Sequence, residues 1–385
     1  MPPLAYNTNL HPAERVAEIA EALAAFAGPL RERLGWERLG VDLRLGLAAL
    51  AEDLAPLRRV LERHRLSAHT INGFPLRPFQ AARVKEDAYR PDWSEPERLD
   101  ASLRLLEAAL ALSDEPLLTI STCPGSFRPL GPTHDDPQQH ARAYGLWAAA
   151  AWRARQRHGR RVVLCLEPEP WCTLESSWDA AWFWRGPLAT SGLAAAAAAL
   201  DGDTAAAQQA IAEHLALCLD TCHSAVIGEE PLAALARLRA AAVPIAKLQV
   251  TAAVVADLRE PMQAAALAAM AEPRFLHQTT LFAADGSCLR LADLDGFAAA
   301  RQRLPAAERA VSHFHVPIDR CELANGLATS ADHAQAMLHA VLASGRPHLA
   351  VETYTWPLLS ARVAEQLAGT ARELATLACW CAQTG

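Results

Sequence analysis

The sequence predicts an α/β protein whose parallel strands close into a (β/α)8 TIM barrel, with residues 1–385 in a single domain. Short apolar runs alternate with longer segments in which apolar residues recur every three or four positions, as in strands followed by helices. The alternation continues along the chain without a composition break that would mark a linker. No glycine-rich phosphate loop follows the first apolar run, which disfavours an open doubly wound sheet.

The candidate strands are one more than an eight-stranded barrel needs, and helical segments such as 12–34 and 47–66 lie between them. They are residues 4–9, 41–46, 68–75, 117–125, 162–170, 215–223, 245–253, 311–318 and 349–356. Residues 275–294 add two strand-like halves about Asp285-Gly286, a hairpin turn signal. We therefore expect a barrel with a hairpin-containing insertion around 254–310.

Composition narrows the class of protein. A hydrophobic content of 51 % in 385 residues is sufficient for a large core. The net charge of −7 and the short charged runs of mixed sign disfavour a nucleic-acid partner. No uncharged apolar stretch is long enough to span a bilayer, and no N-terminal signal pattern is visible. The nine cysteines are scattered without a CxxC pair. We expect a cytoplasmic protein with no membrane span.

Polar residues gather late in five of the candidate strands, on one face of each under period-two alternation. They are Glu167 with Glu169, Asp220 with Cys218, Lys247 with Gln249, His313 with His315, and Glu352 with Tyr354. Active sites of such barrels lie at the C-terminal strand ends. Carboxylates with one or two imidazoles suit Mn²⁺, Mg²⁺, Co²⁺ or Zn²⁺. The pattern therefore predicts a site for a divalent metal whose identity the sequence leaves open.

Several segments resemble the xylose-isomerase-like TIM barrels, particularly the tagatose and psicose 3-epimerases. The order "CLEPEP", "LDTCH", "HFHVPIDR", "VETYT" matches their pattern of a Glu closing strand five, LDTxH on strand six, HFH on strand seven and a Glu ending strand eight. Nearly the whole chain is also similar to the EboE family of metabolite traffic proteins, through "NLHP", "INGFP", "VKEDAYRPDW", "ISTCPGS", "KLQV" and "VETYTWP". That resemblance implies a place in secondary metabolism beside other products of one small operon.

The epimerase pattern implies a set of metal ligands: Glu167, Asp220, His315 and Glu352. Its rivals are Gln249 and Glu169. A compact βαβ step from Asp220 reaches Gln249, so either "KLQV" or "HFHV" is strand seven and the other is an addition. If "KLQV" is strand seven, Gln249 is the ligand and His315 belongs to the lid or to the surroundings of the site.

The simplest chemistry for this site is proton transfer next to a carbonyl of a secondary-metabolite or polyol-like substrate, as in an isomerase or epimerase. Glu167 and Glu352 would act as base and acid, and Lys247 or His223 would polarise the oxygen. The expected substrate-binding residues are His223, His313, Arg320, Asn72 and Lys85, and Asn7, Asn9 and His11 are further candidates for the cup.

The sequence is also compatible with two other functions. A non-catalytic metabolite-binding or handover protein would use Trp171, Trp178, Trp182 and Trp184 as an aromatic lid over the barrel mouth. A metal-dependent phosphodiesterase or endonuclease-like hydrolase is possible on the same fold, although the acidic balance disfavours a nucleic-acid substrate. Catalysis and simple binding are therefore both compatible with the sequence.

Overall fold

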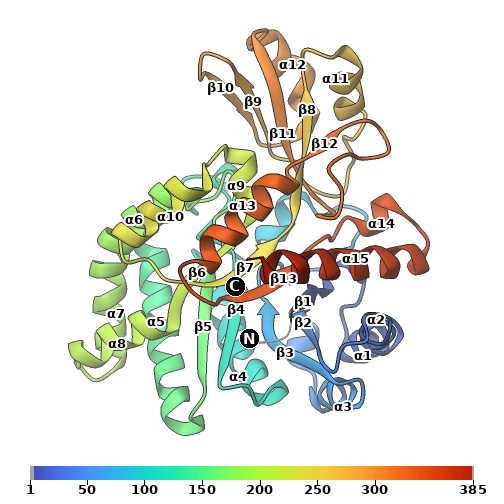
Figure 1. Ribbon diagram of the computed structural model, residues 1–385. Helices are drawn as coiled ribbons and strands as arrows, with labels where there is room; N and C mark the ends of the chain where they lie inside the picture. Colours follow the sequence, from blue (N-terminus) through green and yellow to red (C-terminus); the bar gives the residue numbers. More distant parts are fainter. Residues whose placement is uncertain (1–3, 384–385) are drawn as a thin grey trace.

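A computed structural model describes residues 4–383 and contains a closed barrel of parallel strands in the order β1-β13-β7-β6-β5-β4-β3-β2 (Figure 1). This confirms the (β/α)8 TIM barrel. The barrel strands are β1 (Ala5–Asn7), β2 (Leu39–Arg44), β3 (Leu66–Asn72), β4 (Leu117–Thr122), β5 (Arg161–Leu166), β6 (Leu215–Asp220), β7 (Ile245–Val250) and β13 (His348–Val351). Strand β7 is "KLQV", so the alternative strand-seven segment "HFHV" lies outside the barrel.

The strands are followed by helices that surround the barrel. These helices are α1 (Val16–Ala22), α2 (Gly28–Leu34), α3 (Ala55–Arg63), α4 (Pro96–Leu112), α5 (Pro137–His158), α6 (Ser177–Phe183), α7 (Leu193–Ala199), α8 (Thr204–His214), α9 (Thr221–Ile227), α10 (Pro231–Ala240), α13 (Ala331–Leu342), α14 (Trp356–Leu359) and α15 (Val363–Ala382). Two short helices lie among them: η4 (Lys85–Tyr89) between α3 and α4, and η6 (Trp184–Gly192) between α6 and α7. No helix within residues 4–383 is long and apolar enough to cross a membrane.

Local sequence sets where the longest helix begins and ends. Asp136 caps α5 because its carboxylate accepts hydrogen bonds from the backbone N–H groups of Gln138 and Gln139. Pro137 occupies the first helical position, where no N–H is needed. Gly159 ends the helix at φ +70°, a left-handed conformation that glycine adopts without steric cost.

The insertion is a second sheet, which leaves the barrel after β7 and forms the lobe at the top of Figure 1. Its strand order is β10-β9-β11-β8-β12, with antiparallel pairing. Its elements are β8 (Ala252–Asp257), α11 (Pro261–Ala268), β9 (Thr279–Ala283), β10 (Cys288–Leu291), α12 (Phe297–Arg303), β11 (Ala307–Val316) and β12 (Ala328–Thr329). The predicted hairpin is β9–β10. The inserted sheet extends beyond the predicted 254–310, because it also takes up β11 and β12.

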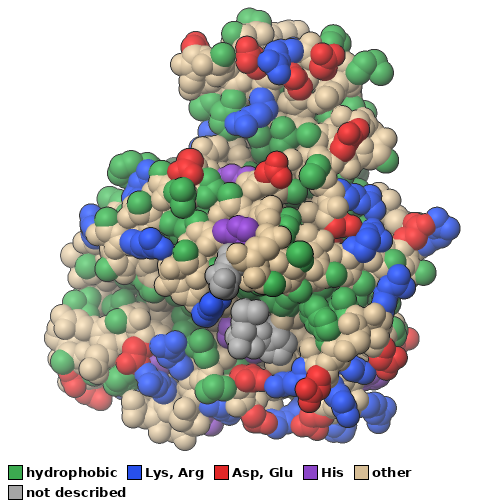
Figure 2. Space-filling model, in the orientation of Figure 1, with side chains coloured by type: hydrophobic (Ala, Val, Ile, Leu, Met, Phe, Trp, Pro, Cys, Tyr) green, Lys and Arg blue, Asp and Glu red, His purple; other side chains and the backbone are tan. Residues whose placement is uncertain are grey.

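The two sheets share an apolar seam next to the C-terminal end of β6. Cys222, Ala225 and Val226 of α9 pack with Ala253 of β8 and Val311 of β11 in one buried cluster. The lobe is therefore anchored beside the strand ends where a barrel site is expected. Figure 2 shows acidic and basic side chains interspersed over the visible face, without a single-sign patch.

The barrel interior contains a buried ion pair. The Nζ atom of Lys247 on β7 donates to both carboxylate oxygens of Asp42 on β2, each at 2.8 Å, and to Oγ of Ser121 at 3.0 Å. Lys247 and Asp42 are both 0 % exposed. A buried charge is tolerated only when it is paired and hydrogen-bonded, so each partner depends on the other.

Replacing Lys247 should therefore be costly. We expect Lys247→Met to lower the free energy of unfolding by about 3–5 kcal/mol, because it leaves the Asp42 carboxylate buried without a counter-charge. Urea denaturation followed by circular dichroism measures the loss. The double variant Asp42→Asn/Lys247→Met should recover part of the stability. A loss below about 1 kcal/mol in Lys247→Met would contradict the account.

Candidate metal centre

Three carboxylates meet at the C-terminal mouth of the barrel. Glu167 directly follows β5, Asp220 ends β6, and Glu352 directly follows β13. One carboxylate oxygen of each lies within 4.8 Å of one from each of the other two, and all three side chains are buried. The register of three neighbouring strands brings these carboxylates together. Asp220 on β6 is paired with Gln249 on β7, and Gln249 is paired with Ala350 on β13, two residues before Glu352. The sequence-predicted carboxylates are thus brought together.

Amide groups hold these carboxylates in place. Nε2 of Gln249 donates to Oε1 of Glu167 at 2.9 Å, to Oδ2 of Asp220 at 3.2 Å, and to Oε2 of Glu352. The other Glu352 oxygen accepts hydrogen bonds from three asparagine Nδ2 atoms: Asn7 and Asn9 at 2.8 Å and Asn72 at 3.1 Å. Asn72 therefore contacts the cluster, and Glu352 is held by residues at the ends of β1, the neighbour of β13, and of β3.

Asp220 is fixed by a helix start. Its Oδ1 accepts from the backbone N–H groups of Cys222 at 2.7 Å and His223 at 3.2 Å, so it caps α9. His223 then donates from Nδ1 to the Pro168 carbonyl at 2.9 Å, which leaves this nitrogen 3.9 Å from Oε1 of Glu167. The "LDTCH" segment places an acid, a thiol and an imidazole together because a strand turns directly into a helix there.

Electrostatics disfavour ionisation of Glu167 and Glu352 in the protein alone. Burial raises the pKa of Glu167 to about 8, and the Asp220 charge also raises it. Burial, together with the charges of Glu167 and Asp220, raises the pKa of Glu352 well above its usual range. In addition, Oε2 of Glu167 is buried and has no hydrogen-bond partner. A divalent cation fits this donor set, since it would supply the missing partner and relieve the repulsion.

Lys247 was predicted as a group that polarises a substrate oxygen, but its ammonium group binds other residues inside the barrel. Its three donors are taken by Asp42 and Ser121, so its Nζ has no free N–H for a substrate oxygen. Burial alone would lower the pKa of Lys247, but the Asp42 carboxylate outweighs it and holds the pKa above its usual value. Lys247 thus remains charged, and Asn7 joins the ion pair to the cluster by donating to both Asp42 and Glu352.

The inserted sheet supplies imidazoles to the same mouth. His313 and His315 on β11 are buried, with their Nε2 atoms 2.9 Å apart. Nδ1 of His315 lies 2.8 Å from the Glu352 carbonyl oxygen, and the ring centroids of His223 and His313 are 4.7 Å apart. Burial lowers the pKa of His315 to about 4 and that of His313 well below its usual range.

Glu169 lies outside the carboxylate trio. Its Oε1 accepts from Tyr89 Oη at 2.6 Å and from Gln278 Nε2 at 3.3 Å. Gln278, at the start of the inserted sheet, also donates to Tyr89 at 2.7 Å and accepts from His313 Nδ1 at 2.7 Å. Glu169 thus orients the insertion's imidazoles rather than the barrel carboxylates.

Aromatic residues close the cavity above the carboxylates. Its volume is about 50 Å³, and Phe79, Phe275 and Tyr354 pack together as its cover, with ring centroids 4.9–5.1 Å apart. The predicted tryptophan lid is wrong, because none of its residues lines this cavity. Trp178 and Trp182 lie on α6 with exposed fractions of 66 % and 53 %.

Of the remaining predicted residues, one lies at the cavity and two lie away from it. Lys85 lines the cavity, but its Nζ is bound to Asp293 Oδ2 at 2.5 Å and to the Glu272 carbonyl at 3.2 Å. Arg320 is exposed, with its guanidinium 6.0 Å from the Trp356 ring. His11 instead contacts Tyr6, 3.3 Å from its hydroxyl.

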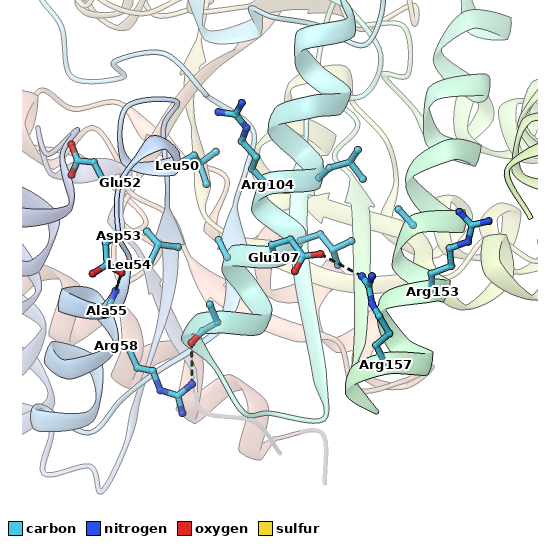
Figure 3. Close-up of a pocket in the computed structure, with 15 residues that line it drawn as sticks. Leu50, Glu52, Asp53, Leu54, Ala55, Arg58, Arg104, Glu107, Arg153 and Arg157 are labelled. Carbon is cyan, nitrogen blue, oxygen red and sulfur yellow. Dashed lines mark hydrogen bonds and ion pairs between the residues drawn. The ribbon is translucent and has the colours of Figure 1, made fainter.

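A separate hollow of about 860 Å³ lies on the outside of the barrel between α3, α4 and α5 (Figure 3). Arginines line it, and two of them form ion pairs: Arg58 with Asp114 at 2.6 Å and Arg157 with Glu107 at 3.7 Å. Within residues 4–383, none of its side chains belongs to a potential metal-ligand cluster. The hollow therefore offers no counterpart to the carboxylate trio at the barrel mouth.

No protein-family model and no curated protein matches the chain. Among solved structures, a xylose isomerase-like TIM barrel protein from Mycobacterium smegmatis in complex with magnesium is 12 % identical and has a TM-score of 0.52, covering 98 % of this chain and 97 % of that one. The IOLI protein with a zinc atom is 12 % identical at a TM-score of 0.50, covering 100 % and 99 %. The chain thus has the fold of xylose-isomerase-like TIM barrels.

Sequence reasoning missed Asp42, Tyr89 and Gln278. Asp42 carried a signal, because it is an acid inside the apolar run "VDLRLG". Tyr89 and Gln278 carried none. Tyr89 ends the short helix η4 and Gln278 lies in the connection before β9, and their contact depends on the insertion's position. Cys222 packs in the apolar seam, and its thiol also lies within 4.8 Å of ring nitrogens of His313 and His315.

Glu373 on α15 anchors the segment after Glu352. It is buried, and it accepts hydrogen bonds from Thr353 Oγ1 at 2.5 Å and Trp356 Nε1 at 2.8 Å. Burial raises the pKa of Glu373 from its ordinary 4.5 to about 7. Between these two values the folded protein binds a proton that the unfolded chain lacks, so the resulting stabilisation is lost as the pH rises through 7.

We therefore expect Glu373→Gln to change the pH dependence of stability. Between pH 5 and 8 the variant should lack a fall in unfolding free energy of about 3 kcal/mol that wild type shows, because Gln does not ionise. Urea denaturation at several pH values measures it. Glu365→Gln, an exposed change on the same helix, is the control and should follow wild type. Parallel curves for wild type and Glu373→Gln would contradict the assignment.

Proposed function

We propose that the protein is a divalent-cation-dependent isomerase or epimerase that moves a proton next to a carbonyl of a polyol-like substrate. The observation that carries this proposal is the trio Glu167, Asp220 and Glu352, buried together at the C-terminal strand ends with one oxygen lacking a partner. Barrels of this architecture place their active sites at that end. The similar solved structures with magnesium and with zinc support a cation there.

The proposed ligands are Glu167, Asp220 and Glu352, with Gln249 as the strand-seven group. Rotation of the Gln249 amide by half a turn would present its oxygen where its NH₂ group now meets the three carboxylates. His315 suits this role less well, because its Nδ1 is bound to the Glu352 carbonyl and its Nε2 faces His313. Under this proposal Gln249, rather than His315, is the strand-seven ligand.

Two of the carboxylates act as the base and the acid of the proton transfer. Glu167 acts as the base, since its Oε2 is buried and free of other partners. Glu352 acts as the acid from the end of β13, where Asn7, Asn9 and Asn72 hold it. A bound divalent cation would stabilise the negative charge that develops on the substrate oxygens.

Substrate entry requires the aromatic cover to move. A cavity of about 50 Å³ holds a few water molecules, whereas pockets for metabolites usually measure about 300–1,000 Å³. The Phe79, Phe275 and Tyr354 rings come from three separate segments, so their separation would open the mouth. Closure over the substrate would exclude water from the proton transfer.

The second candidate function is a metabolite-binding or handover protein in an Ebo-type pathway. The aromatic cover favours it, because Phe79, Phe275 and Tyr354 offer apolar rings to a flat ligand. The EboE resemblance, including its operon partners, rests on sequence motifs alone. Such a protein would bind its ligand without exchanging substrate protons.

Deuterium exchange tests the catalytic proposal. Wild type loaded with Mn²⁺ in D₂O should incorporate deuterium next to the carbonyl of at least one member of a panel of ketopentoses, ketohexoses and keto-inositols, followed by NMR. Glu352→Gln should slow this exchange by about 10²–10⁴-fold, the usual contribution of a general acid or base. It should remain folded by circular dichroism.

The matched control is Glu115→Gln. This carboxyl lies at the opposite end of the barrel in an ion pair with Arg38 and should leave exchange unchanged. Absence of exchange by wild type with every ketose in the panel, or full exchange by Glu352→Gln, would remove the catalytic proposal and favour the binding protein.

A further inference from the structure

His313 and His315 present an unusual contact. Their Nε2 atoms are 2.9 Å apart in a buried position on β11, at the side of the barrel mouth. Each ring is oriented by its other nitrogen: His313 Nδ1 lies 2.7 Å from Gln278 Oε1, and His315 Nδ1 lies 2.8 Å from the Glu352 carbonyl oxygen. Both partners are oxygens that only accept hydrogen bonds.

The surrounding network fixes the protonated nitrogens. Gln278 must turn its NH₂ group toward Tyr89 and the Glu169 carboxylate, so its oxygen faces His313. His313 and His315 therefore carry their protons on Nδ1, and each Nε2 keeps a lone pair. Two lone pairs facing each other repel, so the arrangement requires a positive charge between or beside them.

We propose that His313, His315 and Cys222 form a second metal site, for a soft divalent ion such as Zn²⁺, distinct from the carboxylate trio. Two imidazole nitrogens bound to one tetrahedral ion at about 2.0–2.1 Å stand about 3.3–3.4 Å apart, so a shift of about 0.5 Å would let the two Nε2 atoms share one Zn²⁺. The Sγ of Cys222 lies within 4.8 Å of a nitrogen of each ring. All three residues are buried.

The two sites differ in the ions that they prefer. Thiolate and imidazole favour Zn²⁺ or Co²⁺, whereas the carboxylate trio favours Mg²⁺ or Mn²⁺. The Cys222 Sγ–H now lies 3.6 Å from the Phe314 carbonyl; on metal binding the S–H bond breaks, the sulfur lone pair binds the ion and the proton passes to solvent. Asp220 belongs to the carboxylate trio and is also within 4.8 Å of a His315 nitrogen, so it borders both sites.

This site uses both parts of the protein. Cys222 comes from α9 of the barrel, and the histidines come from the inserted sheet, across the apolar seam that includes Cys222 and Val311. A bound ion would therefore fasten the lobe to the barrel mouth. The alternative source of positive charge is a single proton shared by the two imidazoles, which would involve neither Cys222 nor a metal.

Cobalt substitution separates these alternatives. Chelator-treated protein is reloaded with Co²⁺, and the ions per chain are counted by mass spectrometry while near-ultraviolet absorption reports thiolate-to-cobalt charge transfer. We expect two ions and this absorption in wild type. Cys222→Ser should lose the absorption, and His313→Ala should lose the absorption and one ion. Cys172→Ser, at a buried cysteine that belongs to none of the potential metal-ligand clusters of the described residues, should retain both.

Glu352→Ala distinguishes this site from the catalytic proposal. It should lose the other ion and keep the charge-transfer absorption, whereas loss of the absorption would overturn a separate second site. Wild type without the absorption, or Cys222→Ser with it, would also overturn the proposal and leave the shared proton. Since Cys222→Ser replaces a single atom, it decides the question even if His313→Ala does not fold, which circular dichroism establishes.

Discussion

Mutual repulsion of three buried carboxylates is the constraint on which the barrel mouth depends. Carboxylate oxygens of Glu167, Asp220 and Glu352 lie within 4.8 Å of one another, and all three side chains are buried. Such an arrangement is stable only if hydrogen-bond donors and positive charge surround it. Gln249 supplies an amide to all three, and the asparagines at the ends of β1 and β3 supply donors to Glu352.

The surrounding structure is arranged in layers about this cluster. Below it, Lys247 neutralises Asp42 inside the barrel, and Asn7 links that pair to Glu352. Above it, an inserted sheet contributes imidazoles and part of an aromatic cover. The insertion is therefore a part of the site. Four residues at the barrel mouth belong to it: His313, His315, Gln278 and Phe275. The seventh barrel strand carries Gln249 and no histidine, so the imidazoles of His313 and His315 at the barrel mouth come from the inserted sheet.

The fold and the carboxylate trio could be predicted from sequence because both follow from local patterns. Alternating strands and helices define the barrel, and period-two alternation placed Glu167, Asp220 and Gln249 on inward faces. The ion pair of Lys247 could not be predicted, since its partner Asp42 lies on another strand across the barrel. The exposure of Trp178 and Trp182 could not be predicted either, since it depends on the direction of α6. Likewise, "HFHV" has the pattern of a barrel strand, and only pairing with β8 and β9 assigns it to the second sheet.

Thermal unfolding with and without a hard cation tests most directly whether the carboxylate trio binds an ion. Chelator-treated wild type should gain about 2.7 kcal/mol of unfolding free energy when Mg²⁺ or Mn²⁺ reaches 100 times its Kd, seen as a concentration-dependent rise in Tm. Glu167→Gln should lack this rise. No change in the Tm of wild type with either ion, or an equal rise in Glu167→Gln, would contradict the account.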